Sequence, residues 1–258
     1  MELVLVIAAS LAAGFIDAIV GGGGLVLVPA LFAAYPQAVP ATLFGTNKGA
    51  AIWGTALAAW RYARHVELRW NSLLPAMGAA LAGSALGAWG ATMVDARVWR
   101  IALPVILLAL LIYTLAKKDL GRAHAPLHEG RAEVWRAVAI GGGIGLYDGF
   151  FGPGTGSFFV FLFVRLLGYD FLHASASAKL LNTATNAAAL TLFAATGHLW
   201  WGVAAAMAVA NMAGSWMGSH LAISRGAGFV RGVFLVVVSA LILKTGWDAA
   251  LTWSAVFA

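Results

Sequence analysis

The chain has 258 residues, of which 62% are hydrophobic and only 10% are charged, and its net charge is +6. A soluble domain carries roughly 25% charged residues, so this chain has too few to cover a water-facing surface. The composition excludes a soluble protein and predicts an all-α polytopic membrane protein. Cysteine is absent, which excludes disulfides and thiolate metal sites. The basic excess is typical of cytoplasmic loops and does not indicate a nucleic-acid partner.

Nearly uncharged runs of about 20 residues predict about eight transmembrane segments. The first half of the chain contains runs at 3–35, 41–60, 72–94 and 98–116. The second half contains runs at 134–167, 171–195, 200–223 and 229–244. The first run of each half is too long for one span, and glycines interrupt it at Gly21–Gly24 and at Gly152–Gly156. We therefore predict that the first segment of each half is broken at a Gly-rich turn.

The two halves are related by an offset of 131 residues. This offset maps Gly14 to Gly145, Asp17 to Asp148, Lys48 to Lys179 and Arg100 to Arg231. Because charged residues are rare inside membranes, the matched aspartates and lysines indicate a duplication. The predicted organisation is a first transmembrane repeat at 1–116, a hydrophilic linker at 117–133 and a second transmembrane repeat at 134–258.

The basic residues predict how the broken segments are oriented. If each broken segment turns back as two half-helices, 11 basic residues lie on the linker side and 3 on the other side. The positive-inside rule prefers this arrangement over a single crossing. The linker is then cytoplasmic, both termini lie outside and the two repeats are inverted, which is typical of secondary transporters. The 11 residues are Arg61, Arg64, Arg69, Lys117, Lys118, Arg122, Arg131, Arg136, Arg165, Arg225 and Arg231, and the 3 are Arg97, Arg100 and Lys244.

The Gly-rich breaks are candidate binding sites. A helix that stops inside the bilayer leaves backbone groups that must be buried or line a wet cavity, and the half-helix that follows directs its N-terminal amides and positive dipole end at an anion. The alternative is that glycines allow tight packing, which we favour for Gly83, Gly87, Gly214 and Gly218. The candidate substrate-binding residues at the breaks are Gly22, Gly23, Gly24, Gly154, Thr155, Gly156 and Ser157.

Lys48 and Lys179 lie in otherwise apolar runs, where an ammonium group costs about 2.5 kcal/mol or more. One interpretation is that both lysines bind an anionic substrate. The other interpretation is a structural ion pair within each half, Lys48 with Asp17 and Lys179 with Asp148. The two aspartates are also candidates for binding a coupling proton or cation. The candidate polar neighbours are Thr46, Asn47, Asn182, Thr183 and Asn186. The two halves contribute unequally to this set, because the offset of 131 residues places Ala51 and Thr55 at the positions equivalent to Asn182 and Asn186.

No sequence pattern of an active site is present. The six histidines show no metal-ligand spacing, and no Ser-His-Asp or His-Glu-x-x-His arrangement occurs. The glycine runs do not follow a strand and are not followed by Gly-Lys-Ser/Thr, so a nucleotide loop is excluded. We predict that the protein is not an enzyme and uses no metal and no cofactor.

Several motifs together resemble the TauE/SafE sulfite exporter family of bacterial permeases. They are Gly14-Phe15-Ile16-Asp17 followed by Gly21–Gly24 and Pro29, then Gly45-Thr46-Asn47-Lys48, Gly152–Gly156 and Ala176-Ser177-Ala178-Lys179. The resemblance covers nearly the whole chain. It implies a multi-pass inner-membrane exporter of small sulfur-containing anions such as sulfite or organosulfonates, coupled to protons, with Lys48, Lys179 and the Gly-rich turns as its characteristic residues.

The expected partners are a small anionic solute and membrane lipid, and a homodimer is left open. Two alternatives to anion transport by a carrier also stay open at this point. One is a proton- or cation-linked carrier that uses Asp17 and Asp148, and the other is an anion channel.

Overall fold

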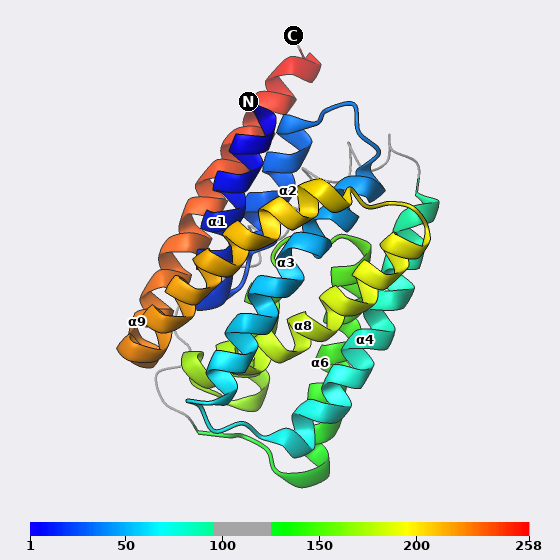
Figure 1. The fold of residues 1–258 in the computed structure, drawn as a ribbon. Helices are drawn as coiled ribbons and strands as arrows, with labels where there is room; N and C mark the ends of the chain where they lie inside the picture. The colour runs from blue at the N-terminus through cyan, green and yellow to red at the C-terminus, as the bar shows by residue number, and fades with distance from the viewer. Residues whose placement is uncertain (95–124, 258) are drawn as a thin grey trace.

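The computed structural model describes residues 1–94 and 125–257 (Figure 1). Regular structure within these residues is helical, with no strand. The predicted segment at 98–116 and most of the predicted linker at 117–133 lie outside the described residues, as do the basic residues Arg97, Arg100, Lys117, Lys118 and Arg122. The all-helical class that the composition predicts is confirmed.

The helices recur in the same order in both halves. The first half contains α1 (Glu2–Val20), α2 (Gly23–Ala34), α3 (Pro40–Ala63) and α4 (Trp70–Met93). The second contains α6 (Gly130–Phe150), α7 (Thr155–Leu162) with the π-helical turn η1 (Phe163–Leu167), α8 (Phe171–Ala195) and α9 (Trp201–Phe257). Adding 131 to Pro40 and Trp70 gives the first residues of α8 and α9. Within α9, Gly226 has a φ of 74° and separates the two predicted segments of this region.

Glycines break the first segment of each half, as predicted. Gly21 and Gly22 separate α1 from α2 with φ values of 76° and 95°. Gly152 and Gly154 lie between α6 and α7 with φ values of 90° and 85°. Such left-handed conformations strongly favour glycine, so the backbone can turn here without strain.

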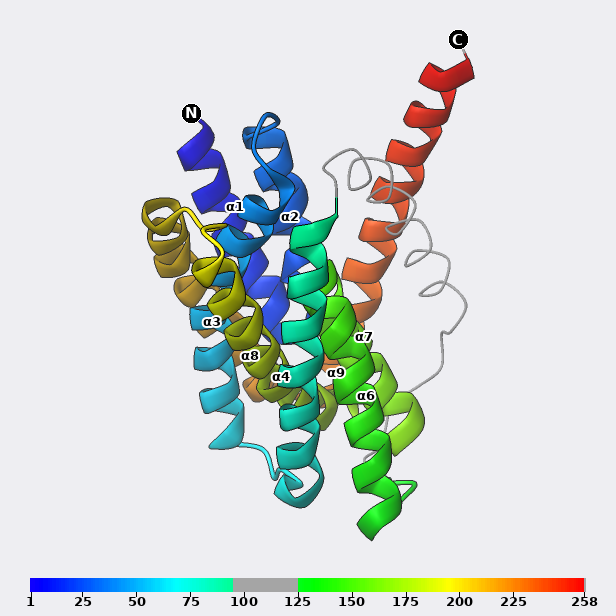
Figure 2. The same ribbon diagram turned by 90° about the vertical axis from the view of Figure 1, so that its right-hand side faces the viewer.

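The broken segments enter the molecule from opposite ends. In Figure 2, α1 runs from the top to the middle and α2 returns to the top, whereas α6 rises from the bottom and α7 turns back down. The loop from α3 to α4 lies at the bottom in Figure 1, together with the start of α6, and both labelled termini lie at the top. The two breaks therefore meet at mid-height.

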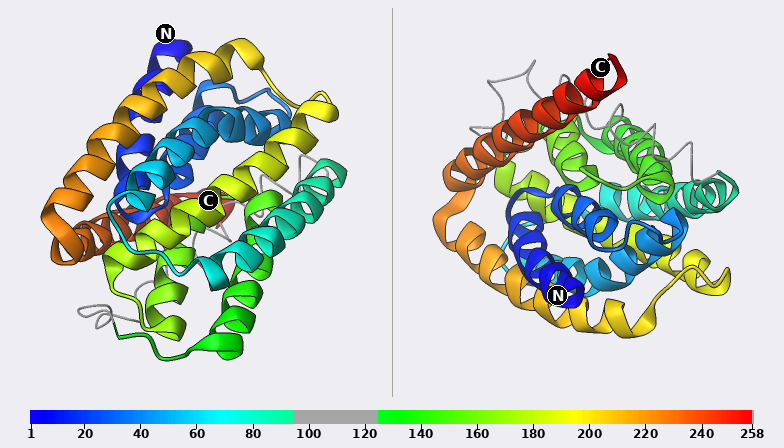
Figure 3. Two further views of the ribbon diagram at one scale, coloured as in Figure 1. Left: turned by 60° about the horizontal axis from the view of Figure 1, so that its bottom comes forward. Right: turned by 90° about the horizontal axis from the view of Figure 1, so that it is seen from above.

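The two halves pack on each other through exchanged helices. In Figures 1 and 3, α9 of the second half lies along α1 of the first, and α4 of the first lies along α6 of the second. Small residues allow these close contacts. A Cβ atom added at Gly145 would lie 2.5 Å from the Ala80 carbonyl oxygen, and one added at the equivalent Gly14 would lie 2.2 Å from that of Asn211. Neither repeat therefore forms its core alone.

The glycines that the sequence analysis assigned to packing do pack against backbone. A Cβ atom at each of them would lie within 2.4 Å of a carbonyl oxygen on the facing helix. These residues are Gly83 and Gly87 on α4, and Gly214 and Gly218 on α9. The packing interpretation is confirmed for all four.

A polar cluster at the bottom of the molecule holds three segments together. The buried Glu133 on α6 accepts hydrogen bonds from Arg69 at 2.8 Å, from Tyr169 at 2.5 Å and from Ser72 at 3.3 Å. Burial, and then the hydrogen bond to Glu133, raise the pKa of Tyr169 above its usual value, so the phenol stays protonated and donates. The cluster fixes the start of α4 and the η1–α8 loop against α6.

Two described helices, α1 and α4, are long and apolar enough to cross a membrane by length and composition alone. The shorter apolar helices are α2 and the segment formed by α7 and η1. Of the remaining long helices, α3 and α8 each contain a buried lysine, Lys48 and Lys179. Polar residues on these two helices therefore lie inside the molecule.

We expect Gly145→Ala to destabilise the protein, because the new methyl group would overlap the backbone of Ala80. Overpacking of this kind costs about 1 to 3 kcal/mol. Gly143 is the matched control, since it lies on the same helix and a Cβ atom there would meet nothing within 4 Å. Thermal unfolding in detergent should show a lower Tm for Gly145→Ala than for Gly143→Ala, and equal values would contradict the packing.

Candidate functional site

The two Gly-rich breaks touch each other at the centre of the molecule. A Cβ atom added at Gly21 would lie 2.2 Å from the carbonyl carbon of Gly156, and one at Gly156 would lie 2.6 Å from the Cα of Gly21. This contact brings together the N-termini of α2 and α7, which come from different halves. Glycine is needed at both positions because the two backbones leave no room for a side chain.

A small polar cavity lies beside this contact. Its volume is about 30 Å³, which is room for about two water-sized groups. It contains both aspartates, one of the two lysines, four asparagines and parts of both breaks. The lining residues are Ala13, Asp17, Gly22, Gly23, Gly24, Leu27, Asn47, Lys48, Ala51, Thr55, Asp148, Gly152, Gly154, Thr155, Gly156, Asn182, Asn186 and Asn211.

The cavity lies where the two repeats meet. Asn186 Nδ2 donates a hydrogen bond to Thr55 Oγ1 at 3.2 Å, and these two positions are separated by the offset of 131 residues. Equivalent positions that touch must lie near the centre of the two-repeat arrangement. Ala51 and Asn182 are a further equivalent pair in the lining. The first half has an apolar residue where the second has an amide, so the two halves contribute unequally to the polar lining, as the sequence predicts.

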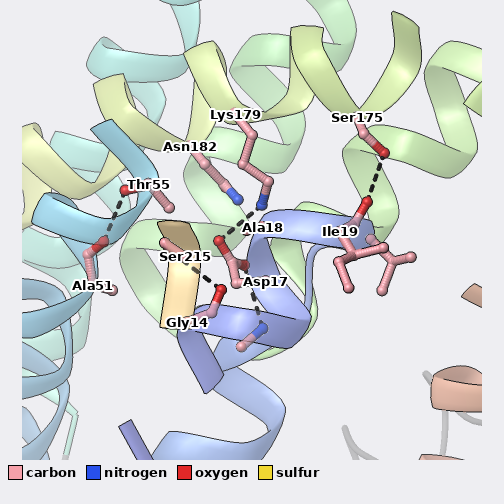
Figure 4. A network of polar contacts seen from close by, with 12 residues as sticks. Gly14, Asp17, Ala18, Ile19, Ala51, Thr55, Ser175, Lys179, Asn182 and Ser215 are labelled. Carbon is pink, nitrogen blue, oxygen red and sulfur yellow. Dashed lines mark hydrogen bonds and ion pairs between the residues drawn. The ribbon is translucent and has the colours of Figure 1, made fainter. Parts of the chain in front are cut away.

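Both buried lysines form ion pairs, and each pair joins the two halves. Lys48 Nζ lies 2.5 Å from Asp148 Oδ2, and Lys179 Nζ lies 2.8 Å from Asp17 Oδ2. Figure 4 shows Lys179 of α8 pointing to Asp17 of α1, with Asn182 beside it. The predicted pairing within each half, Lys48 with Asp17 and Lys179 with Asp148, is therefore wrong. The meeting of the breaks places each aspartate opposite the lysine of the other half.

The four charged side chains are largely shielded from solvent. Side-chain exposure is 4% for Lys48 and 3% for Asp148, and it is 0% for Lys179 and 15% for Asp17. Removing a charge from water costs several kcal/mol, which only a well-placed partner offsets. The four charged side chains can therefore be buried only because each ammonium group is paired with a carboxylate.

Asparagine side chains supply further polar groups to the cavity. The Oδ1 atom of Asn47 is buried and has no hydrogen-bond partner among the described residues. Asn211, on α9, donates from Nδ2 to the carbonyl oxygen of Ser10 at 3.1 Å. Asn211 is not among the residues predicted for the site, although an amide in the otherwise apolar run at 200–223 is a signal that could have identified it.

Ten of the predicted substrate-binding residues line the cavity, and four do not. The four outside the lining make contacts elsewhere: Lys179 pairs with Asp17, Thr46 Oγ1 accepts from the Trp200 N–H, Thr183 Oγ1 donates to the Lys179 carbonyl, and Ser157 Oγ donates to the Val20 carbonyl. The ten in the lining are Asn47, Lys48, Asn182, Asn186, Gly22, Gly23, Gly24, Gly154, Thr155 and Gly156.

The arrangement combines groups that bind anions with groups that bind protons or cations. Lys48 and the amides at the starts of α2 and α7 favour negative charge. Asp17 and Asp148 line the same cavity and can hold a proton or a cation. The cavity thus contains both positively and negatively charged side chains.

The chain matches the family model described as sulfite exporter TauE/SafE over residues 6–245. The chain belongs to this family. Membership extends through both halves and includes both breaks and both lysines. Members of the TauE/SafE family and the relatives below are named as membrane transporters and not as enzymes, and this chain is a membrane transporter of the same kind.

Curated relatives cover most of the chain. It is 36% identical to the probable membrane transporter protein YfcA of Escherichia coli over 242 residues, which are 92% of this chain and 87% of that protein. It is 35% identical over 237 residues to the probable membrane transporter protein ORF9 of a Sinorhizobium species, with 92% and 89% covered. A probable membrane transporter protein of Haemophilus influenzae is 31% identical over 245 residues, with 92% and 91% covered. No solved structure matches significantly.

The crossed pairing can be tested by double-mutant analysis. Lys48→Gln alone leaves Asp148 as an unpaired buried charge, and breaking a buried pair in this way costs about 3 to 5 kcal/mol. Adding Asp148→Asn should restore most of the thermal stability. Adding Asp17→Asn should not, because it also breaks the pair with Lys179. Rescue of Lys48→Gln by Asp17→Asn would show that the pairs form within the halves.

Proposed function

We propose that the protein is a secondary transporter of small sulfur-containing anions, such as sulfite or organosulfonates, coupled to protons and working as an exporter. The observation that carries the proposal is the cavity between the two breaks, where Lys48 and the N-termini of α2 and α7 face the same space. Family membership supports the substrate class. The cavity is nearly closed to a solute at about 30 Å³, so a conformational change is needed to admit one.

The anion site in this proposal has two sets of donors. Lys48 provides the charge, and the backbone amides at the start of α7, at Gly156 and Ser157, are directed toward the break. Asn47 also lines the cavity, where the Nδ2 group of its amide can donate to an anion. A bound anion would offset part of the cost of keeping these polar groups away from water.

We propose further that the protein lies in the inner membrane with about eight transmembrane segments in two inverted repeats, and that the broken first segment of each half turns back without crossing. The opposite directions of α1 and α6 in Figure 2 support this. The helix ends at the bottom of Figure 1 contain Arg61, Arg64, Arg69 and Arg131, and the positive-inside rule assigns them to the cytoplasm. Both termini are then periplasmic. This orientation is the one in which the broken segments turn back at mid-depth.

The natural absence of cysteine allows this topology to be tested without background labelling. We expect Val39→Cys, in the exposed loop before α3, to react with a membrane-impermeant maleimide in intact cells. Glu67→Cys, in the loop before α4, should react only after the membrane is opened. The reverse pattern would contradict the orientation, and labelling of both from outside would contradict a crossing by α3.

The substrate class can be tested by binding to purified protein. Sulfite, sulfate, thiosulfate, taurine and sulfoacetate should be compared with carboxylate controls by thermal stabilisation and calorimetry. Lys48→Gln should weaken binding of the best anion by about one to two decades, because a charge-assisted hydrogen bond contributes about 1.5 to 3 kcal/mol. Arg64→Gln removes the same charge from an exposed position and should bind as wild type does. Equal affinities for wild type and Lys48→Gln would exclude Lys48 from the site.

A second candidate is a proton- or cation-linked carrier in which the aspartates bind the transported ion. It is favoured by one observation, that both aspartates line the cavity whereas only one lysine does. The two candidates differ in what stabilises the purified protein. Stabilisation by Na⁺ with every anion tested would support the cation carrier, whereas stabilisation by sulfur oxyanions with every cation would support the anion carrier.

A further inference from the structure

The two ion pairs are equivalent in sequence but not in their access to the cavity. Lys48 and Asp148 both line it. In the other pair, only Asp17 lines the cavity, and Lys179 is completely buried behind it. A solute in the cavity can therefore reach both members of the first pair but only the carboxylate of the second.

The two carboxylates also differ in how the protein holds them. Asp17 is held through both oxygens, because Oδ2 accepts from Lys179 at 2.8 Å and Oδ1 accepts from the Gly23 N–H at 3.3 Å. Asp148 is held through Oδ2, which accepts from Lys48. Among the described residues, no hydrogen bond to its Oδ1 atom is found. Among the described residues, Asp148 thus has one oxygen without a hydrogen bond, whereas both oxygens of Asp17 accept one.

The different lengths of the two breaks explain this asymmetry. In the first half, α2 starts at Gly23, three residues after α1 ends at Val20, so the amide of Gly23 reaches back to Asp17. In the second half, α7 starts at Thr155, five residues after α6 ends at Phe150. There Thr155 Oγ1 donates to the Gly152 carbonyl at 2.7 Å, and the break contains Pro153. The second half-helix is fixed by its own turn and not by the aspartate.

Charge neutrality links anion binding to Asp148. Among the described residues, the charged groups that line or back the cavity are Asp17 on α1, Lys48 on α3, Asp148 on α6 and Lys179 on α8, and their charges sum to zero. An anion that enters leaves one uncompensated negative charge in a site shielded from water, which is costly. It must also compete with the Asp148 carboxylate for Lys48. A proton on Asp148 removes both obstacles.

We propose that Lys48–Asp148 is the working pair of the transporter and that Lys179–Asp17 is a structural clamp. In the working pair, Asp148 takes up one proton from water as its carboxylate releases the Lys48 ammonium, which then binds the monoanion. The total charge in the site stays at zero. The Lys179–Asp17 pair stays closed throughout and holds the start of α2 through Gly23. This inference rests on the proposed anion transport.

The experiment uses methanesulfonate as the probe, because its charge is fixed at −1 over the pH range used. Binding to the purified full chain is measured by calorimetry from about pH 6 to about pH 8, in buffers with different ionisation enthalpies, which report proton uptake. For wild type we expect about one proton taken up per anion. Because one proton is taken up with each anion, the affinity should fall by about tenfold for each pH unit across this range.

The two matched variants should then separate the pairs. Asp148→Asn should bind methanesulfonate without proton uptake and with an affinity that does not change with pH. Asp17→Asn should keep the proton uptake and the pH dependence, whatever its absolute affinity. If Asp17→Asn removes the proton uptake, or if both variants keep it, the division between the pairs is wrong.

Charge-neutral double variants provide the test if a single variant fails to fold. Asp148→Asn with Lys48→Gln should fold and should lose both methanesulfonate binding and proton uptake. Asp17→Asn with Lys179→Gln should keep proton-linked binding, and its loss would overturn the proposal.

If wild type binds neither methanesulfonate nor any anion of the screen, the proposed function itself fails. Binding by wild type without proton uptake contradicts the working pair and leaves anion transport intact.

Discussion

Two lysines and two aspartates buried at the centre of a hydrophobic protein are the constraint on which the rest of this structure depends. An unpaired charge in such surroundings is too costly to keep, so each ammonium must meet a carboxylate. The pairs Lys48–Asp148 and Lys179–Asp17 meet this requirement across the two halves. The halves cannot separate without exposing four charges to an apolar medium, and the pairs therefore fix the relative position of the repeats.

The crossed pairs require two backbones to approach closely, and glycine makes this approach achievable. At the breaks, Gly21 and Gly156 lie in backbone contact, and along the exchanged helices Gly14 and Gly145 do the same with their neighbours. The result is a small polar cavity surrounded by tightly packed helices.

The duplication provides two similar sets of groups, and their differences matter for function. One break is short, and its aspartate also caps the following half-helix. The other break is longer, and its half-helix is held by a threonine turn. Both oxygens of Asp17 thus accept hydrogen bonds, whereas only one oxygen of Asp148 does so among the described residues. In the proposal made above, one of the two equivalent ion pairs works in transport and the other supports the structure.

The sequence by itself determined the helical class, the two glycine breaks and most of the cavity lining, because these follow from local composition and from spacing along the chain. For example, the offset of 131 residues gives the first residue of α8 from the first residue of α3, and the four glycines of α4 and α9 pack against backbone as predicted. It failed for the partner of each lysine, because a repeat presents the same aspartate twice and spacing cannot distinguish them. It also missed Asn211, which faces the site only because α9 packs on the other half. The tertiary structure alone decided these points, since they depend on contacts between segments that lie 100 or more residues apart in the chain.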